Sequence, residues 1–254
     1  MTHTDVRTFV VIGAGSWGTA LALLLANNGH RVRLWGRERA HLTTLSRQGC
    51  NARYLPGIPF PENLHAVVEL ETAVRGADAV LIAVPSEGFR ECVQQLRAHL
   101  AVDARILWAT KGLEAGSQKL LHQVLAEELP RSVYAIISGP TFAKEVALQL
   151  PTAVTVAAPD LEFAQQVALW LCNPMFRAYT STDVTGVEVG GAVKNIMAIA
   201  AGIADGLGFG ANTRAALITR GLAEIQRLGV ALGGSAETFM GLTGLGDLVL
   251  TCTD

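Results

Sequence analysis

The chain has 254 residues, of which 50% are hydrophobic and 17% charged, and its formal net charge is −2. This length exceeds one average domain, so we expect two domains, and the apolar content excludes a disordered chain. An isoelectric point of about 6.3 gives no basic field for nucleic acid, so an anionic ligand would have to be held by a few placed cations and helix ends.

The uncharged stretch at residues 9–29 is long enough to raise the alternatives of a membrane span or a signal peptide. Its three glycines, Gly13, Gly15 and Gly18, follow a β-branched run and precede a run rich in alanine and leucine. Glycine-rich turns fit poorly in an apolar targeting segment. We therefore predict a strand, a tight turn and a helix here, and no membrane span.

The turn itself, residues 13–18, matches the G-x-G-x-x-G pattern. In dinucleotide-binding folds Gly13 would make the tight turn, Gly15 would admit the pyrophosphate, and Gly18 would let the helix pack closely on the strand. The amino end of the helix offers unpaired N–H groups to phosphate oxygens. The pattern indicates a dinucleotide site, and a merely tight strand–helix turn is the alternative.

The end of the second predicted strand bears on the choice between NADP and NAD. A carboxylate there binds the ribose 2′-hydroxyl of NAD, whereas an arginine accommodates the 2′-phosphate of NADP. The chain has no acid at the strand end, but Arg37 and then Glu38 follow it closely. Arg37 favours NADP, NAD stays open because Glu38 is adjacent, and a solvated loop arginine is the alternative.

Apolar and β-branched runs predict seven strands, with helical patterns between most of them. The strands are expected at residues 9–12, 32–35, 79–84, 106–109, 134–137, 152–157 and 176–180, and the helices at 17–28, 88–100, 118–129 and 161–171. Strands that are apolar on both faces and separated by helices are typical of a mostly parallel sheet covered on both sides.

No strand pattern follows Asp183. Thr185 and Glu188 have capping-box spacing before a long apolar run, and Asn212–Thr213 precede a second expected helix at residues 214–232. We therefore predict a Rossmann-type nucleotide-binding domain over residues 1–184 and a helical substrate domain over 185–254. The last residues carry no helix-terminating signal, so we expect a chain that is cut short.

Lys194 is the only charged residue between Val189 and Ala204. A helix that is apolar all round is a buried helix, and lysine is almost never buried without a partner. A lysine facing a cleft can protonate the alkoxide that hydride delivery to a ketone produces. Gly190 and Gly191 would clear room there for a flat ring or a substrate. A lysine whose head reaches solvent is the alternative.

Polar residues also follow two of the predicted strands at their carboxyl ends, where doubly wound sheets bind ligands. Lys111 supplies a second cation for carbonyl or phosphate oxygens, with a surface lysine as the alternative. Gly139 and Thr141 can present backbone and hydroxyl donors, and Asp247 supplies a carboxylate that we expect near Lys194. The scattered cysteines and histidines predict neither a metal site nor a disulfide, which fits a reducing cytosol.

In this order the segments resemble bacterial NAD(P)-dependent glycerol-3-phosphate dehydrogenase. The matching motifs are GAGSWGTA at 13–20, TKG at 110–112, SGPTFAKE at 138–145, GGAVKN at 190–195, GLGFGANT at 206–213 and GLGDL at 244–248. The resemblance implies an α/β Rossmann-type parallel-sheet domain followed by an all-α domain, as in 6-phosphogluconate dehydrogenase, in a cytoplasmic homodimer. It also implies interconversion of dihydroxyacetone phosphate and sn-glycerol 3-phosphate with NADP or NAD, which supplies phospholipid synthesis.

The resemblance implies roles for individual residues. Lys194 corresponds to the proton donor and acceptor, and Lys111 touches both substrate and cofactor. Substrate contacts fall on Gly139, Thr141 and Asp247, with Asn195 and Thr251 as nearby polar positions, and cofactor contacts on Gly13, Gly15, Ser16, Trp17, Gly18, Arg37 and Ala143. The family continues with a Ser-Arg-Asn segment whose arginine binds the substrate phosphate, and this sequence ends at Asp254, before that segment.

Two other functions stay open at this point. A β-hydroxyacid dehydrogenase also pairs a Rossmann domain with a helix that carries a lysine, although the segments at 110–112 and 246–247 fit it poorly. A non-catalytic NAD(P)H sensor would bind the cofactor without turnover, but it needs no buried proton donor such as Lys194.

Overall fold

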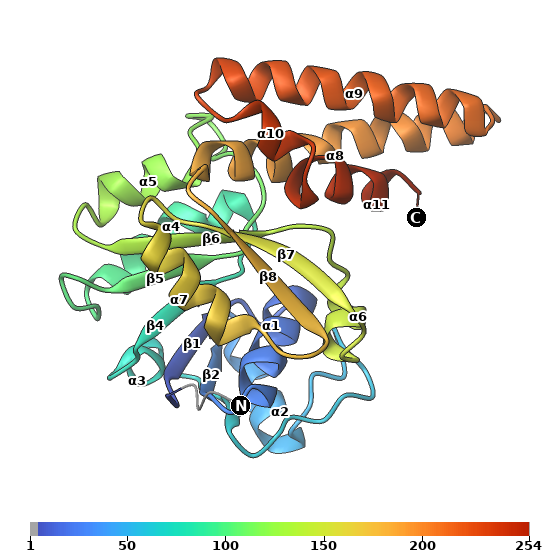
Figure 1. Ribbon diagram of the computed structural model, residues 1–254. Helices are drawn as coiled ribbons and strands as arrows, with labels where there is room; N and C mark the ends of the chain where they lie inside the picture. The colour runs from blue at the N-terminus through green and yellow to red at the C-terminus, as the bar shows by residue number, and fades with distance from the viewer. Residues whose placement is uncertain (1–4, 254) are drawn as a thin grey trace.

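The computed structural model describes residues 5–253, which fold into a sheet flanked by helices and a layer of long helices beside it (Figure 1). The sheet has the order β3-β2-β1-β4-β5-β6-β7-β8, and every neighbouring pair is parallel except β6 and β7. The strands are β1 (Thr8–Ile12), β2 (Arg31–Trp35), β3 (Leu64–Ala66), β4 (Ala79–Ile82), β5 (Arg105–Trp108), β6 (Val133–Ser138), β7 (Thr152–Ala157) and β8 (Phe176–Ser181).

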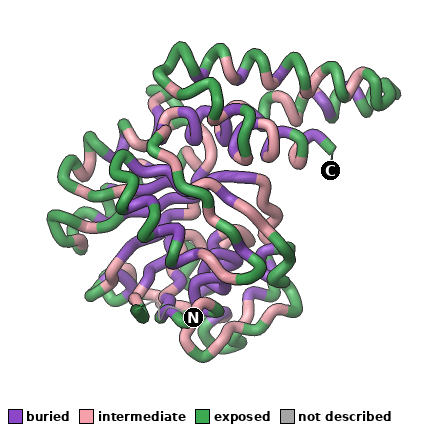
Figure 2. The backbone as a smooth tube through the Cα atoms, in the orientation of Figure 1, coloured by how far each residue is buried: buried purple, intermediate pink, exposed green. Residues whose placement is uncertain are grey.

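Helices cover both faces of this sheet, so the central strands β1 and β4 are buried along almost their whole length, whereas the edge strand β8 is largely exposed (Figure 2). One core cluster includes residues of α1 and α7, and the other includes residues of α4 and α5. The helices of this part are α1 (Ser16–Asn27), α2 (Arg39–Gln48), α3 (Leu70–Val74), α4 (Phe89–Arg97), α5 (Leu121–Glu128), α6 (Ala143–Ala147) and α7 (Leu161–Leu171). This arrangement is the doubly wound α/β architecture that the strand pattern predicts.

After β8 the described chain is helical. Helices α8 and α9 lie side by side, and a small third core joins them to α10 and α11 (Figure 1). The bounds are α8 (Val184–Gly206), α9 (Ala211–Ala231), α10 (Ala236–Phe239), a π-helical turn η2 (Leu242–Gly246) and α11 (Asp247–Thr253). Because this layer lies beyond the carboxyl ends of β5 and β6, its side chains meet the loops that follow those strands.

Of the described helices, α8 alone is long and apolar enough to cross a membrane by length and composition. It packs against α9 and α11, and its buried Glu188 and Lys194 both have polar partners within the protein. These contacts identify α8 as a core helix of the helical layer.

All seven predicted strands and the predicted helices occur; β7 and α7 have the predicted bounds, and the other elements differ at one or both ends. Helix α5 begins at Leu121 instead of residue 118, and α9 begins at Ala211 instead of 214. The sequence patterns missed β3, α2, α3, α6 and α10 (Ala236–Phe239). These elements are short or expose most of their residues, as in α2, where only Leu42 and Leu45 are buried.

The predicted capping box at the start of α8 is wrong. The N-cap is Asp183, whose carboxylate accepts the Gly186 N–H at 2.8 Å, and Thr185 lies inside the helix. Asp183 also accepts the Ser235 N–H at 2.8 Å, so one carboxylate serves two segments. Glu188 instead lies inside the helix and pairs with His122 on α5.

Candidate active site

The glycine-rich turn between β1 and α1 is shaped for a close-lying ligand. Gly13 has a φ of +120°, and a Cβ there would lie 2.5 Å from the Ala83 carbonyl oxygen, while one at Gly18 would lie 1.8 Å from the Gly13 carbonyl oxygen. A Cβ at Gly15 would meet nothing within 4 Å. The outer glycines are therefore required by the fold, whereas Gly15 keeps free space before the amino end of α1, as a pyrophosphate requires.

This turn opens into a cleft of about 650 Å³ between the ends of β2 and β4, lined by Ser16, Arg37 and Glu38 among others. Glu38 is engaged by Arg53, with 2.8 Å between Oε2 and Nη1, whereas Arg37 is exposed and makes no ion pair with another described residue. The free space, the helix end and an available cation fit a dinucleotide such as NADP or NAD. Trp17 and Ala143 are half-buried and pack on the core beside the turn.

Gly15→Ala and Gly18→Ala should therefore fail in different ways. We expect Gly15→Ala to fold with an unchanged melting temperature and to lose NADPH affinity by about tenfold or more, since its methyl group occupies ligand space. Gly18→Ala should instead lose several kcal/mol of stability, about 3 or more, because the turn must move. Thermal melts and NADPH fluorescence titrations separate the two effects, and a Gly15→Ala protein with wild-type affinity would contradict this assignment.

Two lysines from distant parts of the chain share one buried carboxylate. Lys194 Nζ, on α8, donates to Asp247 Oδ1 at 2.7 Å, and Lys111 Nζ, after β5, donates to Asp247 Oδ2 at 2.5 Å. Asp247 is 1% exposed. Lys194 Nζ also donates to Thr251 Oγ1 at 2.6 Å, and Lys111 Nζ to the Gly139 carbonyl oxygen at 2.9 Å. With both lysines protonated the cluster carries one net positive charge, which suits an anionic substrate.

Gly190 and Gly191 of α8 do not clear room for a ligand, contrary to the prediction. A Cβ at Gly190 would lie 2.6 Å from the Thr243 carbonyl oxygen, and one at Gly191 would lie 2.9 Å from Ser138 Oγ. The glycines instead let η2 and the end of β6 approach α8 closely. This approach places Asp247, which begins α11, beside Lys194.

Burial lowers the pKa of the Lys111 ammonium, against the attraction of Asp247, and the charge of Lys194 lowers it further. Lys111 is therefore poised to give up a proton more readily than a solvated lysine. From the sequence we predicted an apolar environment for Lys194 but took Lys111 to be a loop cation. Lys111 is buried by α8 and α11, which are remote from it in the sequence.

The other predicted substrate residues differ in position. Thr141 Oγ1 donates to the Gly139 carbonyl oxygen at 3.3 Å, so both lie beside Lys111. Asn195 is exposed on α8, and its side chain forms no hydrogen bond with a described residue. Ser138 was not among the predicted site residues. Its buried hydroxyl has no hydrogen-bond partner among the described residues. Its place directly before the predicted contact Gly139 could have pointed to it in the sequence.

Comparison with protein families gives two adjoining matches. Residues 8–164 match the model for the N-terminus of NAD-dependent glycerol-3-phosphate dehydrogenase, and residues 183–254 match the model for its C-terminus. Among curated proteins, glycerol-3-phosphate dehydrogenase (NAD(P)+) of Thioalkalivibrio sulfidiphilus is 58% identical over 96% of this chain and 74% of its own length. The enzyme of that name from Bartonella tribocorum is 56% identical over the same shares.

Solved structures give the same result. Glycerol-3-phosphate dehydrogenase from Coxiella burnetii superposes with a TM-score of 0.95 at 50% identity, covering 98% of this chain and 76% of that one. The enzyme from Saccharomyces cerevisiae gives 0.86 at 29% identity, covering 99% and 78%. A ketopantoate reductase from Ralstonia eutropha, at 17% identity and a TM-score of 0.57, shares the fold alone.

Proposed function

The chain belongs to the NAD-dependent glycerol-3-phosphate dehydrogenase family and is an NAD(P)-dependent oxidoreductase, and we propose that Lys194 exchanges the proton with the substrate oxygen. The reaction is the reduction of dihydroxyacetone phosphate to glycerol 3-phosphate and its reverse. The bound nicotinamide supplies or accepts the hydride. The chain must therefore hold the ketone and give its oxygen a proton during reduction.

The contacts of Lys194 support this role. Its ammonium is held from two sides, by Asp247 Oδ1 at 2.7 Å and by Thr251 Oγ1 at 2.6 Å. Two fixed acceptors orient the remaining N–H of a protonated lysine, which can point at a carbonyl oxygen. In reduction Nζ gives its proton to the developing alkoxide, and in oxidation the neutral amine takes the hydroxyl proton. Asp247 keeps the Lys194 ammonium in place through this ion pair.

We assign the substrate contacts to the residues around Lys111. Lys111 supplies positive charge for the anionic triose, and Gly139 and Thr141 lie beside its ammonium. Asn195 and Thr251 complete the proposed set, although the exposed Asn195 lacks the contacts that support the others.

For the cofactor we propose the turn residues Gly13, Gly15, Ser16, Trp17 and Gly18, together with Arg37, Lys111 and Ala143. Arg37 lines the cleft without an ion-pair partner among the described residues, while Glu38 is held by Arg53. An available arginine beside an occupied carboxylate favours the 2′-phosphate of NADP over the bare ribose of NAD.

We also propose that the chain forms a homodimer. The described chain offers an apolar row along α8, in which Ile196, Ile199 and Ile203 are each at least 60% exposed, and Leu207, directly after the helix, extends it at 66%. Such a row supports association into a homodimer. We also propose a cytoplasmic location. We further propose a division into domains 1–184 and 185–254, which is supported by the change from sheet to helices at α8.

The substrate assignment is tested by NADPH oxidation. We expect steady loss of NADPH absorbance with dihydroxyacetone phosphate, and a kcat/KM lower by about a hundredfold or more with dihydroxyacetone or a non-phosphorylated keto acid, because these lack the dianion that the lysine cluster attracts. Preference for the keto acid would instead favour the β-hydroxyacid dehydrogenase reading. Tight NADPH binding without turnover of any of these compounds would favour a sensor.

A further inference from the structure

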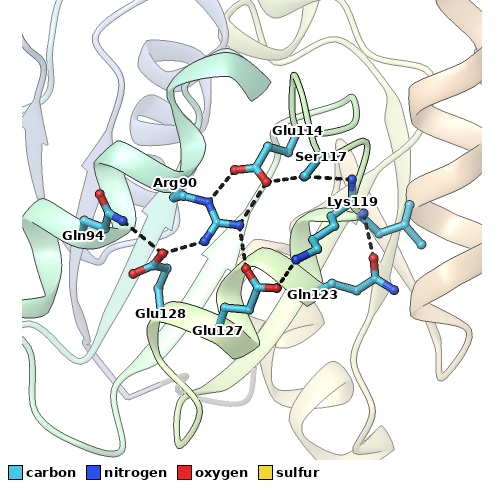
Figure 3. Close-up of polar contacts among 9 residues, drawn as sticks. Arg90, Gln94, Glu114, Ser117, Lys119, Gln123, Glu127 and Glu128 are labelled. Atoms are coloured by element: carbon cyan, nitrogen blue, oxygen red, sulfur yellow. Dashed lines mark hydrogen bonds and ion pairs between the residues drawn. The ribbon is translucent and has the colours of Figure 1, made fainter.

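An arginine surrounded by three carboxylates contacts the Lys111 loop, residues 111–119, through Glu114 (Figure 3). Arg90, on α4, donates from Nε and Nη2 to both oxygens of Glu114 at 2.6 and 2.9 Å. It also donates from Nη2 to Glu127 and from Nη1 to Glu128, each at 2.6 Å. Arg90, Glu114, Glu127 and Glu128 are called the Arg90 cluster below.

The Arg90 cluster differs from the surface ion pairs of the protein in its burial. The Arg90 side chain is 28% exposed and that of Glu114 is 14% exposed, whereas the Arg39–Glu69 pair is 68% and 61% exposed. The bidentate geometry is the strongest form of arginine–carboxylate contact. The guanidinium, with help from Ser117, lowers the pKa of Glu114 to about 2, so this carboxylate is charged throughout the working range of an enzyme.

Glu114 belongs to the loop that carries Lys111. Its second oxygen accepts the Ser117 hydroxyl, and Ser117 Oγ accepts the Lys119 N–H at 3.2 Å, so the loop folds around this carboxylate. The loop leaves β5 through Gly112, whose φ of +132° and close approach to Ser86 fix its direction. Arg90 therefore holds the loop three residues beyond Lys111.

The same cluster is joined to the helix that carries Lys194. Glu127 and Glu128 are on α5, and the amino end of α5 is pinned to α8 by Glu188, which accepts the His122 N–H at 3.0 Å and also pairs with the His122 ring. Helix α5 thus connects the Arg90 cluster at one end with α8 at the other. Helix α5 therefore contacts both elements that carry the lysines sharing Asp247, namely the Lys111 loop and α8.

We propose that Arg90 is a positioning residue, which acts through Glu114 to hold the Lys111 loop so that Lys111 Nζ reaches Asp247 and the substrate. This inference rests on the proposed function of Lys111. Arg90 itself touches neither lysine. Its effect passes through the loop backbone, where a displacement of about 1 Å is enough to lower a rate by two orders of magnitude.

Glu114→Gln and Glu128→Gln form a matched pair that separates positioning from general stability. Each removes the negative charge of one Arg90 partner, and each wild-type carboxylate has one further side-chain contact, to Ser117 in the first case and to Gln94 on α4 in the second. Of the two, only Glu114 contacts the Lys111 loop. We expect Glu114→Gln to lower kcat/KM for dihydroxyacetone phosphate by about tenfold, and Glu128→Gln by less than about twofold, with similar melting temperatures and an unchanged Kd for NADPH in both.

A second readout does not depend on turnover. The rate of Lys111 acylation by an amine-reactive reagent, followed by peptide mass spectrometry, should rise about threefold or more in Glu114→Gln and stay at the wild-type rate in Glu128→Gln. Equal losses of kcat/KM and equal acylation rates in the two variants would overturn the proposal. If the wild-type protein does not reduce dihydroxyacetone phosphate, the proposed function fails, and the acylation rates still decide whether Arg90 positions Lys111.

Discussion

Lys194→Ala should lower kcat by about 10²–10⁴-fold while leaving the Kd for NADPH nearly unchanged. The variant removes the ammonium that Asp247 and Thr251 hold, so the alkoxide formed by hydride addition must take its proton from water. The Gly13–Gly18 turn and the cleft beyond it do not include Lys194, so cofactor binding should persist. Stopped-flow NADPH oxidation and a fluorescence titration measure the two quantities.

Lys144→Ala is the matched control for this experiment. Lys144 is exposed on α6, directly after the proposed cofactor contact Ala143, and its removal takes away the same charge. It should leave kcat within about twofold of wild type. A Lys194→Ala protein that keeps wild-type kcat would exclude Lys194 as the proton donor, and a loss of NADPH affinity equal to the loss of rate would make Lys194 a binding residue.

Asp247→Asn should cost both stability and activity. It leaves the buried ammonium groups of Lys111 and Lys194 without their shared carboxylate, and breaking a buried pair in this way costs about 3–5 kcal/mol. For a protein of this size about 2–4 °C of melting temperature accompanies each kcal/mol. We expect a fall of about 10 °C, and a loss of kcat/KM of about a hundredfold because the lysines repel each other out of position.

The loss should depend on pH in a definite direction. The pKa of Lys111 is already lowered by burial, and without Asp247 only burial and the charge of Lys194 act on it, so the folded protein favours the neutral amine more strongly. When folding lowers the pKa of a basic group, the folded state loses stability by the full amount at pH values below the folded pKa. This loss of stability shrinks as the pH rises from the folded pKa toward the unfolded pKa. The gap in melting temperature between Asp247→Asn and wild type should therefore be wider at pH 6 than at pH 9.5.

Asp205→Asn serves as the control, since Asp205 forms an exposed ion pair with Arg214 at 2.8 Å. Such a pair contributes at most about 1 kcal/mol, so this variant should melt close to wild type at both pH values. An Asp247→Asn protein as stable and as active as Asp205→Asn would show that the carboxylate does not hold the two lysines.

The strands and the cofactor turn could be predicted because their signals are local. Runs such as residues 79–84 are apolar on both faces, and the spacing of Gly13, Gly15 and Gly18 requires only a strand before it and a helix after it. The same local reasoning failed at the start of α8. There Asp183 caps the helix, and Glu188 has its partner on α5, far away in the chain.

The proton-transfer cluster was harder to predict than the cofactor turn. The isolation of Lys194 in an apolar helix indicated that a partner must exist, and Asp247 was expected to be that partner, although the two residues lie 53 positions apart and no local pattern joins them. The Arg90 cluster gave no signal at all, because its glutamates lie 24 to 38 residues from Arg90 in the chain and each member resembles an ordinary surface charge. The role assigned to Gly190 and Gly191 was wrong, since the sequence could not show which backbone approaches them.

Chemical rescue of Lys194→Ala tests most directly whether the amine of Lys194 is the proton donor. The variant would be assayed for NADPH oxidation by dihydroxyacetone phosphate with increasing concentrations of methylamine or ethylamine, and with potassium chloride at matched ionic strength. We expect the rate to rise with the amine by about tenfold or more and to follow the fraction of amine that is protonated. A rate that ignores the amine, or that rises equally with salt, in a variant that still binds NADPH would contradict proton transfer by Lys194.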